Sequence, residues 1–163
     1  EIANDVQPKP RRLLRVLYSN TPYVEGWGFY SQFLMAEQGY MGDTTGFRLT
    51  WLKQKMRGLA NAILDIRLQT MGMTDQQALD LMIKDTYQER EEATAKLQRA
   101  QLSSTQLPTY YAGLKGWLDT RERYKQAKGS AFTLRDFHDS ALKESGVPLP
   151  ELQKLLLPQA KTE

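Results

Sequence analysis

The chain has 163 residues, of which 40% are hydrophobic and 25% charged, and its formal net charge is +3. This composition is typical of one soluble globular domain with a sizeable core, and so mild a charge argues against a nucleic-acid-binding protein. Cysteine is absent, which excludes disulfides, thiolate metal sites and a cysteine nucleophile. No run of about 18 apolar residues exists, so no membrane-spanning segment is predicted.

The N-terminal part is predicted to contain a loose arm and two helices. Residues 1–10 are polar and proline-containing, and a short helix is expected over residues 11–18. Because the chain begins at Glu1 without an initiator methionine or a signal-peptide pattern, it resembles a mature product or an excised fragment. Pro22 suits the first turn of the next helix, and Gly39 suits its end. Apolar residues surround this helix in nearly every direction, which predicts that it is buried.

A long helix ending near Met71 is predicted next. Its apolar residues recur at spacings of three and four, which places them on one stripe. They are Leu49, Leu52, Met56, Leu59, Ile63 and Ile66. We expect this stripe to pack in the core. Thr74 to Gln77 then fit a capping box at the start of a further helix.

The C-terminal half is predicted to be helical as well. Helices are expected over residues 88–102, 108–128, 133–144 and 148–157. No period-two alternation of useful length is present, so the predicted fold is all-α, a single-domain multi-helix bundle. The predicted organisation is an N-terminal arm and short helix (1–21), a helical domain (22–157) and a tail (158–163).

Glu25 is the unusual residue of the first long helix, where we expect it in the first turn. A buried carboxylate must be paired, hydrogen-bonded, protonated or bound to a metal. Gly26 and Gly28 beside it each weaken a helix by about 1 kcal/mol relative to alanine, and they leave space for another backbone or a ligand. Local conflicts of this kind often mark functional sites. The chain holds one histidine, His138, and no complete catalytic constellation.

Several segments together resemble a known family. They are Glu25-Gly26-Trp27-Gly28-Phe29-Tyr30, Leu64-Asp65-Ile66-Arg67-Leu68 with Gly72-Met73-Thr74, Tyr110-Tyr111-Ala112-Gly113, Phe132 to Asp139, and Pro148-Leu149. In this order they resemble the bacterial family known as domain of unknown function 885 (DUF885), which itself resembles zinc-dependent metallopeptidases of the gluzincin type. The resemblance covers roughly residues 20–157.

The resemblance implies the C-terminal part of a zincin-like α-helical metallopeptidase fold, with Glu25 as the third zinc ligand. The alternative is a helix-start carboxylate favoured by the helix dipole. In the family, a His-Glu-x-x-Pro-Gly-His-like helix supplies two histidine ligands and the general-base glutamate. That helix is not in this sequence, so zinc binding and peptide hydrolysis are expected only in a full-length protein containing the missing N-terminal portion. The chain alone is expected to be inactive and to bind no zinc tightly.

The resemblance also suggests catalytic candidates. Tyr110 or Tyr111 would be the phenol that polarises the scissile carbonyl, and His138 would donate a hydrogen bond in the transition state. The alternatives are core aromatic residues with surface hydroxyls, and a structural histidine bonded to Asp136, Asp139 or backbone. Since family members are often exported, the bacterial cell envelope, periplasm or exterior is the expected location. The oligomeric state is left open.

Arg67 interrupts an apolar stripe and could clamp a substrate carboxylate, or pair structurally with Asp65 or a glutamate. Two residues depart from the family pattern, because Gln32 stands where glutamate is usual and Gln69 where histidine is frequent. Together with the missing histidine helix, these departures support an alternative function, a non-catalytic helical binding module that is derived from the same fold and lacks metal. An isoelectric point near 9.1 is the only support for a nucleic-acid binder.

Overall fold

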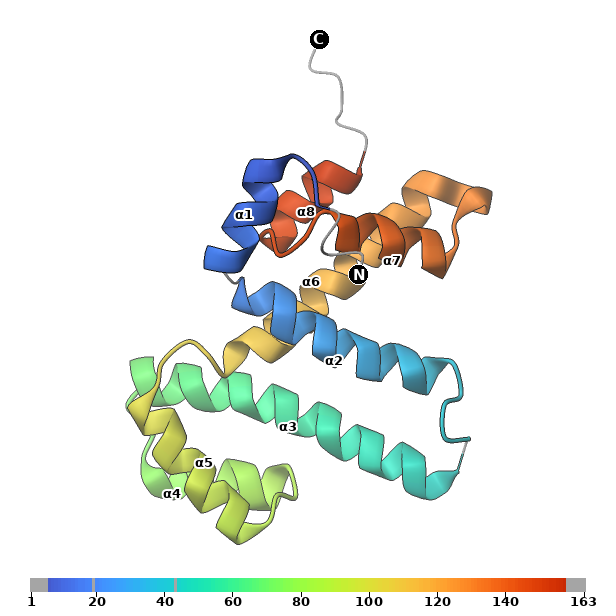
Figure 1. The fold of residues 1–163 in the computed structure, drawn as a ribbon. Helices are drawn as coiled ribbons and strands as arrows, with labels where there is room; N and C mark the ends of the chain where they lie inside the picture. The colour runs from blue at the N-terminus through green and yellow to red at the C-terminus, as the bar shows by residue number, and fades with distance from the viewer. Residues whose placement is uncertain (1–5, 19, 43, 158–163) are drawn as a thin grey trace. The chain divides into compact units, whose positions relative to one another are not determined.

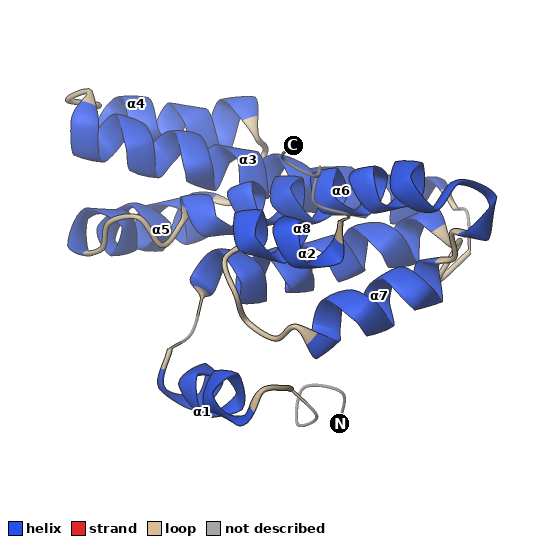
Figure 2. Ribbon diagram, turned by 90° about the horizontal axis from the view of Figure 1, so that it is seen from above, coloured by secondary structure: helices blue, strands red, loops and turns tan. Residues whose placement is uncertain are grey.

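The computed structural model describes residues 6–18, 20–42 and 44–157. In these ranges every regular element is a helix and no strand occurs (Figures 1 and 2), which confirms the all-α prediction. The chain divides into two compact units, one formed by residues 1–30 with 113–163 and the other by residues 31–112. Across the described ranges, no helix combines the length and the apolar character that crossing a bilayer requires.

All the helices predicted from the sequence are present. They are α1 (Lys9–Leu17), α2 (Thr21–Glu37), α3 (Thr45–Thr70), α4 (Asp75–Asp80), α5 (Arg90–Leu102), α6 (Pro108–Lys128), α7 (Leu134–Lys143) and α8 (Leu149–Leu156). A π-helical turn at Leu81–Asp85 follows α4, and a 3-10 turn at Gly129–Ala131 follows α6. Pro108 and Lys128 are the ends predicted for α6. The other observed ends lie within a few residues of the predicted ones.

The helix starts are fixed by side-chain caps that the sequence indicated. The predicted capping box is confirmed, because the Thr74 hydroxyl accepts from the Gln77 amide at 3.3 Å and the Gln77 side chain accepts from the Thr74 amide at 2.9 Å. The Thr133 hydroxyl caps α7 by accepting from the Asp136 amide at 3.0 Å. Such caps satisfy backbone N–H groups that have no partner inside the helix.

The second unit is built around a cluster of small and aliphatic side chains. Its buried members are Leu64, Ala78, Met82, Ala93, Leu97, Ala100 and Leu107, from α3, α4, the π-helical turn, α5 and the loop before α6. Figure 1 shows α3, α4 and α5 side by side in this unit. Two ion pairs, Arg57 with Glu92 and Lys53 with Glu89, also join α3 to the α5 region.

The prediction that the stripe of α3 lies in the core is wrong. The exposed fractions of Leu49, Leu52, Ile63 and Ile66 are 63%, 45%, 38% and 47%. A different face of α3, which includes the fully buried Leu64, packs on the core of the unit. Because α3 is apolar on two faces, its periodicity could not show which face the rest of the chain covers.

The core of the first unit is aromatic. Trp117 is fully buried, and its ring centroid lies 5.0 Å from that of Tyr23 and 4.9 Å from that of Trp27. The Trp117 indole N–H donates to the Tyr23 carbonyl at 3.0 Å. Burial raises the pKa of the Tyr23 phenol to about 12, so this ring stays neutral inside the core. Val6 and Phe137 are also fully buried in this unit.

The prediction that α2 is buried all round is wrong as well. Its buried residues are Tyr23, Gly26 and Tyr30, whose spacings of three and four place them on one face. Trp27 is half-buried beside this face, and Val24 is 52% exposed. The apolar residues on the remaining faces of α2 are therefore not enclosed by the described part of the chain.

Gly26 allows α2 and α6 to cross with their backbones in contact. A Cβ atom on Gly26 would lie 2.4 Å from the Cα of Gly113, and one on Gly113 would lie 2.2 Å from the Pro22 carbonyl oxygen. Both distances are far below van der Waals contact. The close backbone approach expected beside Glu25 is thus present at Gly26. Gly28 is different, because a Cβ atom there would meet nothing within 4 Å.

Candidate functional site

Glu25 lies on an open face of α2. Helix α2 begins at Thr21, where the Asn20 side chain accepts from the Tyr23 amide at 3.0 Å, so the first turn holds no acidic residue. The prediction that Glu25 lies in the first turn is therefore wrong. Since the helix-dipole effect fades within the first turn, it favours a carboxylate here less than expected.

The Glu25 carboxylate is half-buried rather than enclosed, and it has neither a hydrogen bond nor an ion pair within the described residues. At about 100° of rotation per residue, Glu25 lies roughly 140° around the helix from Tyr30. The structure therefore holds this carboxylate away from the aromatic core of its unit. A ligand or another chain segment could reach it.

His138 is tied to Tyr30. The Tyr30 hydroxyl lies 2.9 Å from Nε2 of His138, and the Trp27 ring meets the imidazole edge-on at a centroid distance of 5.4 Å. The guanidinium carbon of Arg121 lies 5.5 Å from the centroid of the Tyr30 ring. If His138 is structural, the sequence predicted Asp136, Asp139 or backbone as its hydrogen-bond partner. The observed partner is the Tyr30 hydroxyl instead.

The surroundings of His138 favour its neutral form. Burial is the main cause that lowers the pKa of His138, and the positive charge of Arg121 lowers it further. Asp139 acts in the opposite direction and is the smaller influence. A neutral imidazole has one N–H donor and one acceptor nitrogen. The Tyr30 hydroxyl already engages Nε2, so Nδ1 is the nitrogen left to act as a donor to a ligand.

We expect acidification to destabilise the protein through His138. The unfolded side chain takes up a proton near its ordinary pKa of 6.5, whereas the folded side chain resists protonation. The contribution of His138 to the free energy of unfolding is therefore fully present above about pH 6.5. It is lost as the pH falls through the pKa of the folded state, which is lower. Urea unfolding from about pH 7.5 to about pH 5.5, one unit on either side of the ordinary pKa, should show a steeper loss for the wild type than for His138→Gln. Parallel curves for the two proteins would contradict this.

The tyrosine candidates lie in the second unit, in the first turn of α6. Tyr110 is half-buried, and its hydroxyl accepts a hydrogen bond from Nε2 of Gln106 at 3.0 Å. Tyr111 is half-buried too, and its hydroxyl makes no hydrogen bond within the described residues. Tyr111 therefore has the freer phenol for donation to a ligand, although both catalytic assignments stay predictions.

Arg67 lines a cavity of about 510 Å³ in the second unit. Asp80 and Asp85 line the same cavity. The nearby carboxylates would oppose the entry of an anionic substrate, so this setting gives the proposed carboxylate clamp little support. Asp65 does not pair with Arg67. Its Oδ2 accepts from the Thr105 amide at 3.1 Å, and its buried Oδ1 has no hydrogen-bond partner within the described residues.

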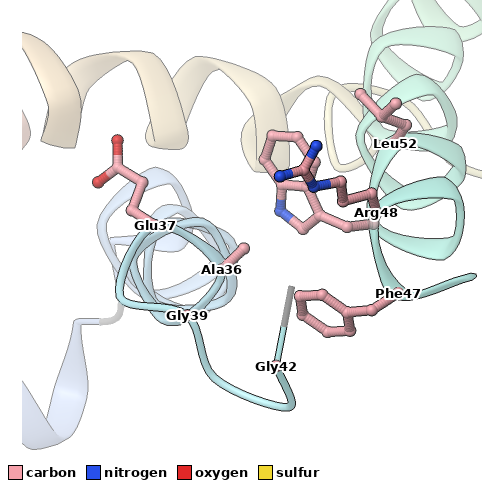
Figure 3. A pocket seen from close by; sticks show the side chains of 8 residues that line it. Ala36, Glu37, Gly39, Gly42, Phe47, Arg48 and Leu52 are labelled. Carbon is pink, nitrogen blue, oxygen red and sulfur yellow. The ribbon is translucent and has the colours of Figure 1, made fainter. Parts of the chain in front are cut away.

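A second cavity, of about 280 Å³, lies between the end of α2 and the start of α3. Figure 3 shows Phe47 and Arg48 extending from α3 toward the C-terminal end of α2, where Gly39 contributes backbone only. The walls are mainly apolar, with Trp51 and Leu52 forming much of the α3 side. Pockets for small molecules usually measure about 300–1,000 Å³, so this cavity suits a side chain or a small ligand.

A complete metal site is not formed by the described residues, where no three His, Asp or Glu side chains come together. Glu25 can offer one carboxylate, and a catalytic zinc site requires three protein ligands. The structure pairs His138 with Tyr30 and not with Glu25. Arg67, Tyr110 and Tyr111 belong to the second unit, and Glu25 and His138 to the first.

Sequence reasoning missed the polar roles of Tyr30 and Arg121. Tyr30 belongs to the helix that was predicted to be buried, and it is fully buried, but its hydroxyl also holds His138. Its position in the Glu25 to Tyr30 signature was the available signal. Arg121 gave no signal, because a basic residue in a polar stretch of helix is ordinary.

The fold and these residues define an all-helical protein whose Glu25 carboxylate is half-buried and makes no hydrogen bond or ion pair within the described residues. Residues 2–156 match the model of the family described as "Bacterial protein of unknown function (DUF885)", and the chain belongs to this family. No curated protein matches the chain.

Solved structures similar to the chain include two bacterial proteins. A "putative lipoprotein of unknown function" from Shewanella oneidensis is 36% identical with a TM-score of 0.88, over 96% of this chain and 28% of that one. The "putative lipoprotein" from Colwellia psychrerythraea is 26% identical with a TM-score of 0.84, over 89% of this chain and 25% of that one. The chain thus spans about a quarter of the length of these relatives.

Proposed function

We propose that this chain is the C-terminal helical portion of a longer zinc-dependent, peptidase-like hydrolase and that Glu25 is its third zinc ligand. One observation carries the proposal: the Glu25 carboxylate is half-buried on α2 and makes no hydrogen bond or ion pair within the described residues. A fully buried carboxylate must be paired, and a half-buried one without a protein partner can serve as a metal ligand. The resemblance of the DUF885 family to gluzincin-type peptidases supplies the chemical class.

The remaining parts of the site would come from elsewhere in the longer protein. Two histidine ligands and the general-base glutamate are expected on the helix that this sequence lacks. Bound zinc would polarise the scissile carbonyl of a peptide substrate and activate water. Tyr111 would donate its phenol hydrogen to the developing oxyanion, with Tyr110 as the other candidate. The descriptions of the two solved relatives as lipoproteins support a location at the bacterial cell envelope.

Metal analysis of the full-length protein tests the role of Glu25. We expect near-stoichiometric zinc in the wild type and zinc affinity at least about tenfold lower in Glu25→Gln, because changes even outside the ligand shell cost about 10–100-fold. Glu91→Gln is the matched control, since Glu91 is an exposed glutamate in the first turn of α5. Peptide hydrolysis should fall in parallel with zinc content.

Zinc retained unchanged in Glu25→Gln would overturn the ligand assignment. Zinc absent from the wild-type full-length protein would overturn the peptidase proposal itself. The isolated 163-residue chain is predicted to bind no zinc tightly. Stoichiometric tight binding in a calorimetric titration of that chain would contradict this.

A non-catalytic binding module is the second candidate, and Gln69 favours it. The Gln69 amide donates to the carbonyls of Ala100 at 2.9 Å and Ser103 at 3.3 Å, at the end of α5. A residue that stands where relatives often carry histidine is thus used here to join α3 to α5. Full-length protein that folds without zinc and binds peptides without cleaving them would establish this function instead.

A further inference from the structure

The exposed stripe of α3 has the spacing of a coiled-coil seam. Its six residues are Leu49, Leu52, Met56, Leu59, Ile63 and Ile66. The spacings of three, four, three, four and three match alternating a and d positions of a heptad repeat. At 1.5 Å per residue the seam is about 26 Å long. Four of the six side chains are 38–63% exposed, so the second unit leaves this seam largely uncovered.

The residues beside the seam are basic or small. In the heptad numbering that this spacing defines, the e and g positions hold Arg48, Lys53, Lys55 and Arg67, and alanine or glutamine elsewhere. Every charged residue at these positions is therefore positive, and one of them, Lys53, already pairs with Glu89 at 3.5 Å. Charges at e and g select the partner of a coiled-coil helix. Asp65, the one acidic residue of α3, is buried and accepts from the Thr105 amide.

The seam ends at an apolar recess. Leu52 belongs both to the seam and to the wall of the 280 Å³ cavity, together with Phe47 and Trp51 (Figure 3). Phe33 of α2 packs on Trp51 with a centroid distance of 5.3 Å, which stabilises this wall. A helix lying on the seam could insert one large apolar side chain into the recess.

We propose that this seam binds an acidic amphipathic helix belonging to the part of the protein that lies outside these 163 residues. The solved relatives are similar to this chain over only 28% and 25% of their length, so most of each relative lies outside the matching region. The corresponding part of this protein would supply the helix that covers the seam. A second copy of the chain is a poor partner, because its basic e and g residues would face identical charges. The proposal does not depend on zinc or on Glu25.

Peptide binding tests the chemistry of the partner. The probe is a labelled three-heptad peptide with leucine at a and d and glutamate at e and g, and the control peptide has lysine at e and g. Fluorescence anisotropy should show the glutamate peptide binding the chain at least about tenfold more tightly than the lysine peptide, with the difference shrinking in high salt. Equal affinities or no binding of the glutamate peptide would overturn the proposal.

Seam variants test the location. The double variant Leu49→Gln/Ile63→Gln should weaken binding of the glutamate peptide by about tenfold or more, since two apolar anchors are lost. Both side chains are exposed, so the helical content and melting temperature should stay near the wild type. Leu102→Gln is the matched control, because Leu102 is 90% exposed outside the seam. Affinity unchanged in the double variant would overturn the assignment of this surface.

Cysteine labelling of the full-length protein tests the source of the partner helix. In a cysteine-free background, Ile63→Cys and Leu102→Cys should both react in the 163-residue chain, with Leu102→Cys the faster because Leu102 is 90% exposed and Ile63 38%. In the full-length protein, Ile63→Cys should react at least about tenfold more slowly, because buried thiols are protected, while Leu102→Cys should be unaffected. An equal rate for Ile63→Cys in the full-length protein and in the 163-residue chain would overturn the proposal that the partner helix comes from the same protein. A gene that encodes no more than this chain would overturn it as well. So would a dimer of the chain that the double variant dissociates.

Discussion

Replacing Gly113 with alanine is expected to lower the free energy of unfolding by about 3 kcal/mol, at the upper end of the range for overpacking. The new methyl group would lie 2.2 Å from the Pro22 carbonyl oxygen and 2.5 Å from the Cα of Gly26, both backbone atoms. A flexible side chain could move aside, but relieving this clash requires α2 and α6 to separate. Separation would also disturb the aromatic core beside the crossing. Urea unfolding followed by circular dichroism measures the effect.

Gly28→Ala is the matched control for this prediction. Gly28 lies in the same helix as Gly26, yet a Cβ atom there would meet nothing within 4 Å. Alanine should therefore stabilise the protein by up to about 1 kcal/mol through its helix propensity. Gly26→Ala should behave like Gly113→Ala. If Gly113→Ala were as stable as Gly28→Ala, the backbone crossing would be wrong.

Local features of the fold could be predicted from the sequence because short-range chemistry determines them. Thr74 with Gln77 forms a capping box within four residues, and Pro108 opens α6 where its missing N–H costs nothing. Gly39 and Gly72 have φ of 74° and 63° at the ends of α2 and α3, a conformation that glycine adopts readily. These signals involve residues close together in the chain.

Burial of the helix faces could not be predicted in the same way. The stripe containing Leu49 and Ile63 and the face containing Leu64 are both apolar, and only tertiary packing selects the face with Leu64. The same limit applies to α2, whose apolar residues are more numerous than the contacts available within the described chain. The exposed apolar faces of α2 and α3 are suited to contact with a further partner.

In the candidate site, too, short-range features could be predicted from the sequence and tertiary contacts could not. The motif identified Glu25, but its place in the second turn depends on where α2 starts, which the Asn20 cap determines. The bond between Tyr30 and His138 joins residues 108 positions apart in the chain. No spacing rule predicts such a contact. It is established only when α2 and α7 pack in one unit.

Trp117→Ala is expected to cost about 3–5 kcal/mol, the usual penalty for removing a large buried aromatic side chain. Trp117 is fully buried, and its ring contacts Tyr23, Trp27 and Tyr30 at centroid distances of 5.0, 4.9 and 5.9 Å. Its loss would leave a cavity among rigid rings that cannot collapse easily. The Tyr30 ring that positions His138 would lose its stacking partner, so the pH dependence of stability should weaken as well.

Two variants make this prediction specific. Trp117→Phe keeps an aromatic ring but removes the indole donor to the Tyr23 carbonyl, so it should cost less, about 1–2 kcal/mol. Trp51→Ala removes a tryptophan that is only half-buried beside an open cavity, and its cost should be well below that of Trp117→Ala. Chemical unfolding of the three variants gives the ranking. Removing a dominant core residue must lower the free energy of unfolding more than removing a residue at a cavity wall. Equal losses for Trp51→Ala and Trp117→Ala would therefore show that Trp117 does not organise the core of its unit.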